Sequence, residues 1–188
     1  KTVLKWNQVR ASWPDEEIHL FGPGTDSGTF DYFTGAIVGE EGKSRGDYTA
    51  SEDDNVLVQG VASDKNALGY FGVAYYTQNK DKLTLVSVDD EDEANGAGAV
   101  LPEYENVVKG TYQPLSRPLF IYVATKALAK PEVKGFIDFY LANGGKLSKE
   151  VGYISLPDEA YSLVSKRLES KKVGSLFNTD SAKGMTIQ

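Results

Sequence analysis

A short apolar run that ends in a glycine-rich turn and leads into a helix-like segment is the feature that most constrains this chain. Residues 18–21 (Ile-His-Leu-Phe) have the length and apolar character of a β-strand, and the breaker Gly22-Pro23-Gly24 follows directly. Ser27 then supplies a good N-cap for a helix. Four apolar residues after it fall near helical spacing: Phe30, Phe33, Ile37 and Val38. This order of strand, turn and helix is typical of α/β proteins.

Strand-like and helix-like runs alternate along most of the remaining sequence, which predicts an α/β fold with a largely parallel or mixed sheet. The other strand-like runs are short and apolar, and they cover residues 68–73, 83–88 and 117–123. Between the first helix and the next lies a polar, glycine-containing loop over residues 39–50.

Three further helices are expected from capping signals and apolar spacing. One begins at about Ser51 or Asp53, where an acidic first turn suits the helix dipole. A second covers residues 125–144, with Pro131 in its first turn and Gly144-Gly145 as its stop. The third covers residues 157–170 and is expected to turn four residues inward: Ala160, Leu163, Val164 and Leu168.

Composition excludes several classes of protein. The formal net charge of −7 opposes nucleic-acid binding, because a phosphate backbone requires a basic face. The chain has no cysteine, which removes disulfides, thiolate catalysis and cysteine-ligated zinc, and its one histidine, His19, rules out a multi-histidine metal site. No apolar run approaches the roughly 20 residues that a membrane-spanning helix needs. We therefore expect no metal, no cofactor and no membrane span.

Two further motifs match known ligand sites only superficially. Gly42-Lys43-Ser44 is similar to the end of a Walker A loop, but that loop requires glycine at position 37, which is Ile37. Residues 89–93 form a run of carboxylates whose spacing is not that of an EF-hand loop. We interpret this run as a solvated surface loop.

The segment Thr25-Asp26-Ser27-Gly28-Thr29 admits three chemical interpretations. Asp-Ser-Gly-Thr is the residue order of an aspartic protease, but that motif needs an apolar strand leading straight into the aspartate. Ser27 as a nucleophile would need a base, and no geometry recommends His19. A glycine-rich turn that delivers hydroxyls and backbone N–H groups to a helix start is instead typical of an oxyanion site. An ordinary N-capped helix remains the alternative to that site.

Arg45 lies in the glycine-flanked loop after this helix-like segment. A planar guanidinium binds an oxyanion through two parallel hydrogen bonds, so Arg45 is a candidate anion ligand. An ordinary surface arginine is the alternative interpretation.

Several motifs, in this order along the chain, resemble the phosphate-binding subunit of the phosphate ABC importer, the PstS-like family. The clearest are the run from Gly22 to Phe33, with Gly-Thr-Asp-Ser-Gly-Thr in it, then Ser44-Arg45-Gly46-Asp47-Tyr48, and the run from Tyr112 to Leu119 with Pro-Leu-Ser-Arg-Pro-Leu. The chain is most similar to the branch with Gly-Thr-Asp-Ser-Gly-Thr in place of Arg-x-Asp-Gly-Ser-Gly-Thr. The resemblance covers almost the whole sequence.

The resemblance implies specific site residues. Ser27, Gly28 and Thr29 match the family's Ser-Gly-Thr and would bind phosphate oxygens. The family's arginine position falls on Pro23, a departure, so Arg45 is expected to supply the guanidinium. The family's aspartate position falls on Thr25, with Asp26 one residue later. Asp26 is therefore either the carboxylate that accepts a hydrogen bond from phosphate or an Asx-type cap of the turn.

The resemblance also implies a fold of the type II periplasmic-binding-protein class, with two α/β lobes that close on the ligand by hinge motion. Residues 20–116 are expected to form one complete lobe, and residues 1–19 and 117–188 part of the second lobe and a carboxyl-terminal segment. The chain starts at Lys1 without a signal-peptide pattern, so either a signal peptide has been removed or the chain is a fragment. The family's other binding motif, a Thr-Gly-rich turn in its first half, is absent from this sequence, which implies the carboxyl-side portion of a longer protein; the missing amino-terminal portion would be a partner.

The implied function is non-enzymatic capture of inorganic phosphate in an interlobe cleft and its delivery to the membrane permease of an ABC importer. The implied location is the periplasm or the extracytoplasmic surface. Binding of another tetrahedral oxyanion, sulfate or molybdate, is the alternative in the same class. The enzyme alternative is a hydrolase that uses Asp26, although no histidine set, cysteine or clear carboxylate pair supports it.

Overall fold

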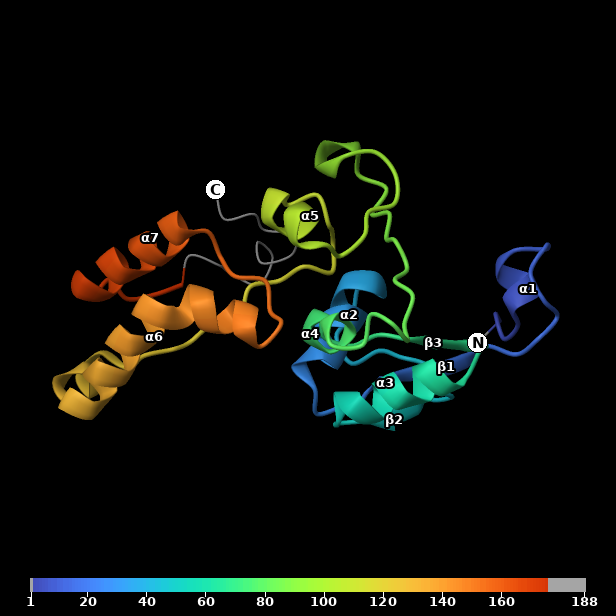
Figure 1. Cartoon of the computed structure of the whole chain (residues 1–188), viewed down its shortest axis with the longest axis horizontal. Helices are drawn as coiled ribbons and strands as arrows, with labels where there is room; N and C mark the ends of the chain where they lie inside the picture. Colours follow the sequence, from blue (N-terminus) through green and yellow to red (C-terminus); the bar gives the residue numbers. More distant parts are fainter. Residues whose placement is uncertain (1, 176–188) are drawn as a thin grey trace. The chain divides into compact units, whose positions relative to one another are not determined.

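The computed structural model describes residues 2–175 of the 188-residue chain. These residues fall into two compact units, Lys1–Leu85 and Val86–Gln188, and each is described by itself (Figure 1). The division of the chain into lobes at residues 20 and 116 stays a prediction. Among residues 2–175, none of the helices combines the length and the apolar character that crossing a membrane requires.

The first unit is built on a parallel three-stranded sheet. Its strands are β1 (His19–Pro23), β2 (Thr49–Ser51) and β3 (Ala67–Gly69), in the order β2-β1-β3. Both neighbours of β1 run parallel to it, with Pro23 opposite Ser51 on one side and Phe21 opposite Gly69 on the other. The predicted α/β class with a parallel sheet is confirmed.

Helices connect these strands, as βαβ crossovers between parallel strands require. The first unit contains α1 (Trp6–Val9), α2 (Gly28–Ile37), α3 (Asp54–Ser63) and α4 (Val73–Thr77). Their buried apolar residues form the core of this unit: Phe30, Leu57, Val58 and Ala74. A Cβ at Gly60 of α3 would collide with the ring of Phe21, so glycine allows α3 to lie close against β1.

The predicted starts of α2 and α3 are confirmed because both depend on local capping. Ser27 is the N-cap of α2, and its side chain accepts a hydrogen bond from the backbone N–H of Thr29. Asp53 is the N-cap of α3 and accepts from the N–H of Asn55. Each oxygen satisfies a helix N–H group that has no partner within the helix.

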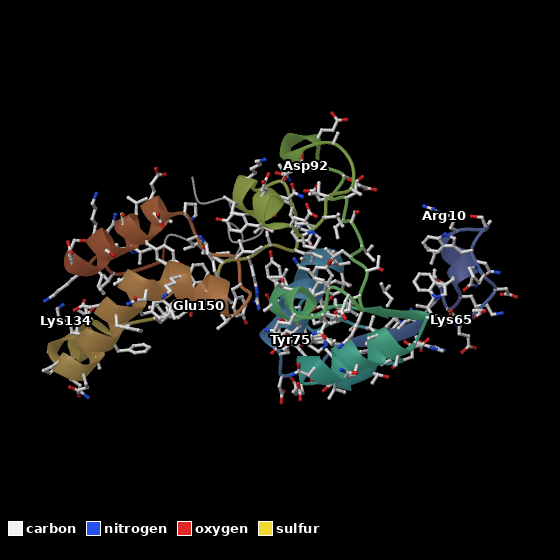
Figure 2. All side chains as sticks on the ribbon, viewed as in Figure 1. Arg10, Lys65, Tyr75, Asp92, Lys134 and Glu150 are labelled. Atoms are coloured by element: carbon white, nitrogen blue, oxygen red, sulfur yellow. The ribbon has the colours of Figure 1, made fainter. Side chains whose placement is uncertain are left out.

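The segment before β1, residues 2–18, contacts the turn that joins α3 to β3. The indole Nε1 of Trp6 donates to the carbonyl oxygen of Asn66 at 3.2 Å, and Lys65 reaches Glu16 at 3.1 Å (Figure 2). At the far side of this segment, the guanidinium of Arg10 lies 4.9 Å from the ring centre of Trp13 (Figure 2). These contacts hold α1 on the first unit.

The second unit is mainly helical over its described residues. It contains η1 (Glu93–Asn95), α5 (Tyr104–Lys109), η2 (Thr125–Ala129), α6 (Pro131–Glu150) and α7 (Asp158–Glu169). Helices α6 and α7 lie side by side as a hairpin (Figure 1). Pro131 is at the start of α6, where its fixed φ and missing N–H cost nothing, as predicted.

Three of the predicted strands differ in the structure. Residues 117–123 form no strand, residues 83–88 contribute only the antiparallel bridge of Val88 with Val100, and β3 ends at Gly69, before α4 begins. A strand exists only where another strand accepts and donates its hydrogen bonds. Within the described part of the second unit no strand pairs with residues 117–123, and Tyr122 is 88% exposed.

The predicted end of α6 at Gly144-Gly145 is also wrong, because the helix continues to Glu150. A Cβ at either glycine would lie within 3.3 Å of the ring of Tyr161 on α7. The two glycines therefore serve the close approach of α7 and do not form a helix stop. On α7, Ala160 is buried as expected, but Leu163 and Val164 are exposed.

Candidate functional site at the carboxyl edge of the sheet

The candidate site lies where the three parallel strands end. Because the strands are parallel, the segments that follow them meet at one edge of the sheet. The turn from Gly24 to Ser27 follows β1, and Glu52 follows β2. The register brings these two segments into contact, since the N–H of Gly24 donates to the carbonyl oxygen of Ser51 at 3.2 Å.

The strand order makes this edge a topological switch point. The connection through α2 leads from β1 to one neighbour, and the connection through α3 leads back across β1 to the other. Parallel crossovers are almost always right-handed, so this reversal places α2 and α3 on opposite faces of the sheet. The connections that follow β1 and β2 therefore lead to opposite faces from one point of the sheet edge, and open α/β sheets bind their ligands at such a point.

Several N–H groups of the turn and of the start of α2 are bonded within this segment. The turn is closed by the N–H of Ser27, which donates to the carbonyl oxygen of Gly24 at 3.1 Å. The hydroxyl oxygen of Ser27 accepts from the N–H of Thr29 at 3.1 Å. Gly28 is exposed, and Ser27 and Thr29 are half-buried, so an anion can reach the positive end of the dipole of α2.

Thr25 and Asp26 lie in the same turn, and both are exposed. The backbone N–H of Asp26 donates to Oε1 of Glu52 at 3.4 Å. The hydrogen bond that caps α2 comes from Ser27 and not from Asp26. The structure thus places three of the six sequence-predicted site residues in the turn (Thr25, Asp26 and Ser27) and two at the start of α2 (Gly28 and Thr29).

Arg45, the sixth residue, makes its contacts within its own loop and with the start of the chain. Its Nε and Nη2 donate to the two carboxylate oxygens of Asp47, each at 2.7 Å, and its Nη1 donates to the carbonyl oxygen of Val3 at 3.1 Å. The hydrogen bonds that Arg45 donates to the Asp47 carboxylate raise the pKa of Arg45 above its ordinary value. Among the described residues, the hydrogen bonds of this guanidinium do not reach Ser27–Thr29.

Sequence reasoning missed two carboxylates, Asp47 and Glu52. Asp47 stands two residues after Arg45, a spacing at which a carboxylate can chelate the guanidinium of its own loop. Glu52 could have been found only by recognising β2, whose three residues are too few for a clear strand signal. Once β2 is paired with β1, Glu52 must lie beside Gly24.

Two tyrosines lie against β1 beneath the turn. The hydroxyl of Tyr48 donates to the carbonyl oxygen of Pro23 at 3.0 Å, and a Cβ at Gly22 would contact both tyrosine rings. The ring of Tyr70 stacks on Phe33 of α2 with 3.9 Å between ring centres. Burial, and then the charge on Tyr48, raise the pKa of Tyr70 to about 12. These rings fix the end of β1 from which the turn projects.

The raised pKa of Tyr70 predicts how stability changes at high pH. A group with a higher pKa in the folded than in the unfolded protein stabilises the fold below the unfolded value, near 10, and this contribution is lost as pH rises toward 12. We expect Tyr70→Phe to reduce the loss of unfolding free energy between pH 10 and pH 12, as measured by urea denaturation. Tyr122→Phe is the matched exposed control, and an equal reduction in both variants would contradict the prediction.

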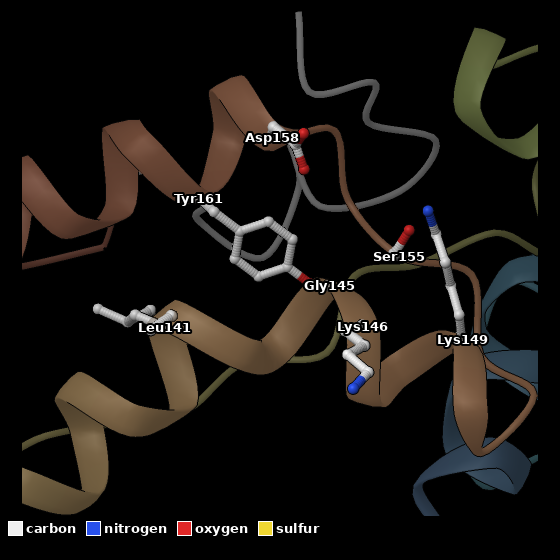
Figure 3. A pocket seen from close by; sticks show the side chains of 8 residues that line it. Leu141, Gly145, Lys146, Lys149, Ser155, Asp158 and Tyr161 are labelled. Atoms are coloured by element: carbon white, nitrogen blue, oxygen red, sulfur yellow. The ribbon is translucent and has the colours of Figure 1, made fainter.

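Three other features of the described residues were candidates for ligand sites: clusters of metal-binding side chains, the acidic loop and the cavity between α6 and α7. Among residues 2–175, no three His, Asp or Glu side chains gather so that they could hold a metal ion. In the predicted acidic loop, Asp90 and Asp92 accept hydrogen bonds from nearby backbone N–H groups. Figure 2 labels Asp92 in this loop. A cavity of about 450 Å³ lies between α6 and α7 (Figure 3), and none of the six predicted residues lines it.

Comparison with known proteins identifies the family. A family model described as the PBP superfamily domain matches residues 1–143. The chain belongs to this family. The protein SphX of Synechocystis is 53% identical to this chain over the whole length of the chain. The phosphate-binding protein PstS of Staphylococcus haemolyticus is 38% identical over 83% of the chain.

A solved structure shares the fold of this PBP superfamily domain. A possible phosphate-binding protein from Planctomyces limnophilus is 46% identical, with a TM-score of 0.74 over 92% of this chain and 60% of that chain. The chain covers 54% of SphX and 47% of PstS, so it spans about half the length of these curated relatives. The fold is therefore that of part of a periplasmic binding protein.

Proposed function

We propose that the chain is the carboxyl-side part of an extracytoplasmic solute-binding protein that captures inorganic phosphate and delivers it to the permease of an ABC importer. The observation that carries this proposal is the Ser27-Gly28-Thr29 turn at the switch point of a parallel sheet. The turn offers an oxyanion two hydroxyls, backbone N–H groups and a helix dipole. PstS and the Planctomyces protein, both named for phosphate, are similar to this chain.

Arg45 supplies the guanidinium of this site in the proposal. Asp47 holds two of its N–H groups and so fixes the plane of the fork, as a carboxylate that orients a ligand does. Thr25 and Asp26 complete the turn, with the exposed carboxylate of Asp26 as the acceptor for the proton that phosphate retains near neutral pH. Sulfate has no such proton and would be repelled.

A further portion of the same protein is the partner in this proposal. The relatives are about twice as long as the chain, and several large apolar side chains of the second unit face solvent. They lie in residues 117–123 and on α6 and α7: Leu119, Tyr122, Phe136, Phe139 and Leu163. Exposed apolar area of this kind marks a surface that is covered by protein.

The role in this proposal is binding rather than catalysis, which is supported by the names of PstS and of the Planctomyces protein as binding proteins. The side chain of Asp26 is exposed, and the backbone N–H of Asp26 donates to Oε1 of Glu52. A hydrolase would need an activated nucleophile or an activated water.

The test joins the chain to the portion of Synechocystis SphX that it does not cover. We expect the chain alone to bind inorganic phosphate weakly and the joined protein to bind it at least about 100-fold more tightly, because a second lobe adds donors and excludes water. Isothermal titration with phosphate, sulfate and molybdate measures both affinity and selectivity. Equal affinity for the three anions, or tight binding by the chain alone, would contradict the proposal.

A further inference from the structure

Glu52 places a carboxylate directly against the candidate anion-binding turn. Its Oε1 accepts from the backbone N–H of Asp26 at 3.4 Å. The same oxygen occupies the space into which a side chain at Gly24 would project. A negatively charged group of the protein therefore lies at a donor that the proposed phosphate site would use.

The sheet register forces this placement. Pro23 is paired with Ser51, so the next residues of the two parallel strands, Gly24 and Glu52, leave the sheet side by side. Gly24 has no side chain and does not have a left-handed φ, so its glycine is needed for space and not for backbone conformation. Because Gly24 has no Cβ, the carboxylate of Glu52 can lie against the turn.

The surroundings of Glu52 show that its charge acts at short range. Burial raises the pKa of Tyr48, and the Glu52 charge raises it further. The pKa of Asp54 is raised in the same direction by burial, by Asp53 and by Glu52. The described contacts of Glu52 include no ion pair with a lysine or arginine. The hydrogen bond that its carboxylate accepts comes from the backbone N–H of Asp26.

We propose that Glu52 is an internal occupant of the anion site, whose carboxylate holds the N–H of Asp26 in the empty site and is displaced by an entering anion. The proposal rests on the function proposed above. An anion that approaches the Ser27–Thr29 turn meets the negative charge of Glu52 and competes with it for the Asp26 N–H. Glu52 therefore lowers the affinity for tetrahedral anions in general and helps to set the concentration at which the site fills.

Two variants remove the occupant by different routes. Glu52→Gln keeps the shape of the side chain and removes its charge. Gly24→Ala keeps the charge and places a Cβ where Oε1 lies, which the flexible end of Glu52 can avoid by moving away. Glu132→Gln, at an exposed position in the first turn of α6, is the control for the change in net charge.

The experiment titrates the chain joined to the remaining SphX portion with inorganic phosphate, and separately with sulfate, while the amide resonances of Asp26, Gly28 and Thr29 are followed by NMR. We expect both Glu52→Gln and Gly24→Ala to lower the Kd for each anion by about three- to fivefold, the size of a partly exposed charge interaction. The Glu132→Gln control should keep the Kd of the original chain.

The outcomes separate the two proposals. If phosphate shifts these amides but neither variant tightens binding, Glu52 is not an occupant and the phosphate site stands. If Glu52→Gln weakens phosphate while it tightens sulfate, Glu52 accepts the phosphate proton, which also overturns the occupant role. If no anion shifts the three amides in any variant of the chain joined to the remaining SphX portion, the phosphate site itself fails and the inference fails with it.

Discussion

Replacing Arg45 with lysine is expected to weaken the binding of inorganic phosphate by at least about tenfold, because hydrogen bonds to a charged group are the strong ones. The guanidinium has a planar fork that Asp47 already orients through two bonds of 2.7 Å. A lysine ammonium is a point charge and cannot contact Asp47 and an anion with the same geometry. Isothermal titration of the chain joined to the remaining SphX portion measures this loss.

The control for Arg45 is Arg10→Lys, which changes an arginine that lies over Trp13 in the same unit. Thermal unfolding of both variants is recorded beside the titrations. A lower unfolding temperature for Arg45→Lys with an unchanged phosphate Kd would show that Arg45 only fastens its loop to Asp47 and Val3. It would then have no part in the site.

Shortening Leu57 to alanine is expected to cost the first unit about 2–5 kcal/mol of unfolding free energy, as large-to-small changes in cores do. Leu57 is 0% exposed and lies on α3, the helix that contacts all three strands. Urea denaturation monitored by circular dichroism gives the value.

The neighbouring variant Val56→Ala is the matched control, since Val56 is 50% exposed on the same helix. We expect it to stay within about 0.5 kcal/mol of the original chain. Equal losses for the two variants would mean that α3 turns a different face toward the sheet.

Local signals in the sequence predicted the features that depend on a few neighbouring residues. Ser27 and Pro131 mark helix starts, and each depends on the backbone geometry within one turn of itself. The strand at the start of the site was also predictable, because β1 lies at the centre of the sheet and is the clearest strand-like run in the first unit.

Features that depend on partners were not predictable. Residues 117–123 have the composition of a strand, but within the described residues no strand pairs with them. Gly144 and Gly145 have the composition of a helix stop, but they lie under Tyr161, which comes from another helix. The composition of a segment gives a preference for strand or helix, and the contacts that the segment makes with other elements decide which structure forms.

The residues of the candidate site also divide into those that sequence neighbours hold together and those that contacts between distant segments bring in. Thr25 to Thr29 are consecutive, so any folded turn holds them together. Glu52 joins them only through the pairing of Pro23 with Ser51, and Arg45 is held by a carboxylate two residues away. A strand of three residues gives too little signal for this register to be read from the sequence.

The central place of β1 in the sheet also matters while the chain is being made. Residues 19–23 are synthesised before both of their neighbouring strands, and the second neighbour, β3, is complete only at Gly69. At synthesis rates of about 5–20 residues per second, one edge of β1 stays open for roughly 2–10 s. Open strand edges are templates for pairing with other chains, so during this interval β1 can pair with a strand of another chain.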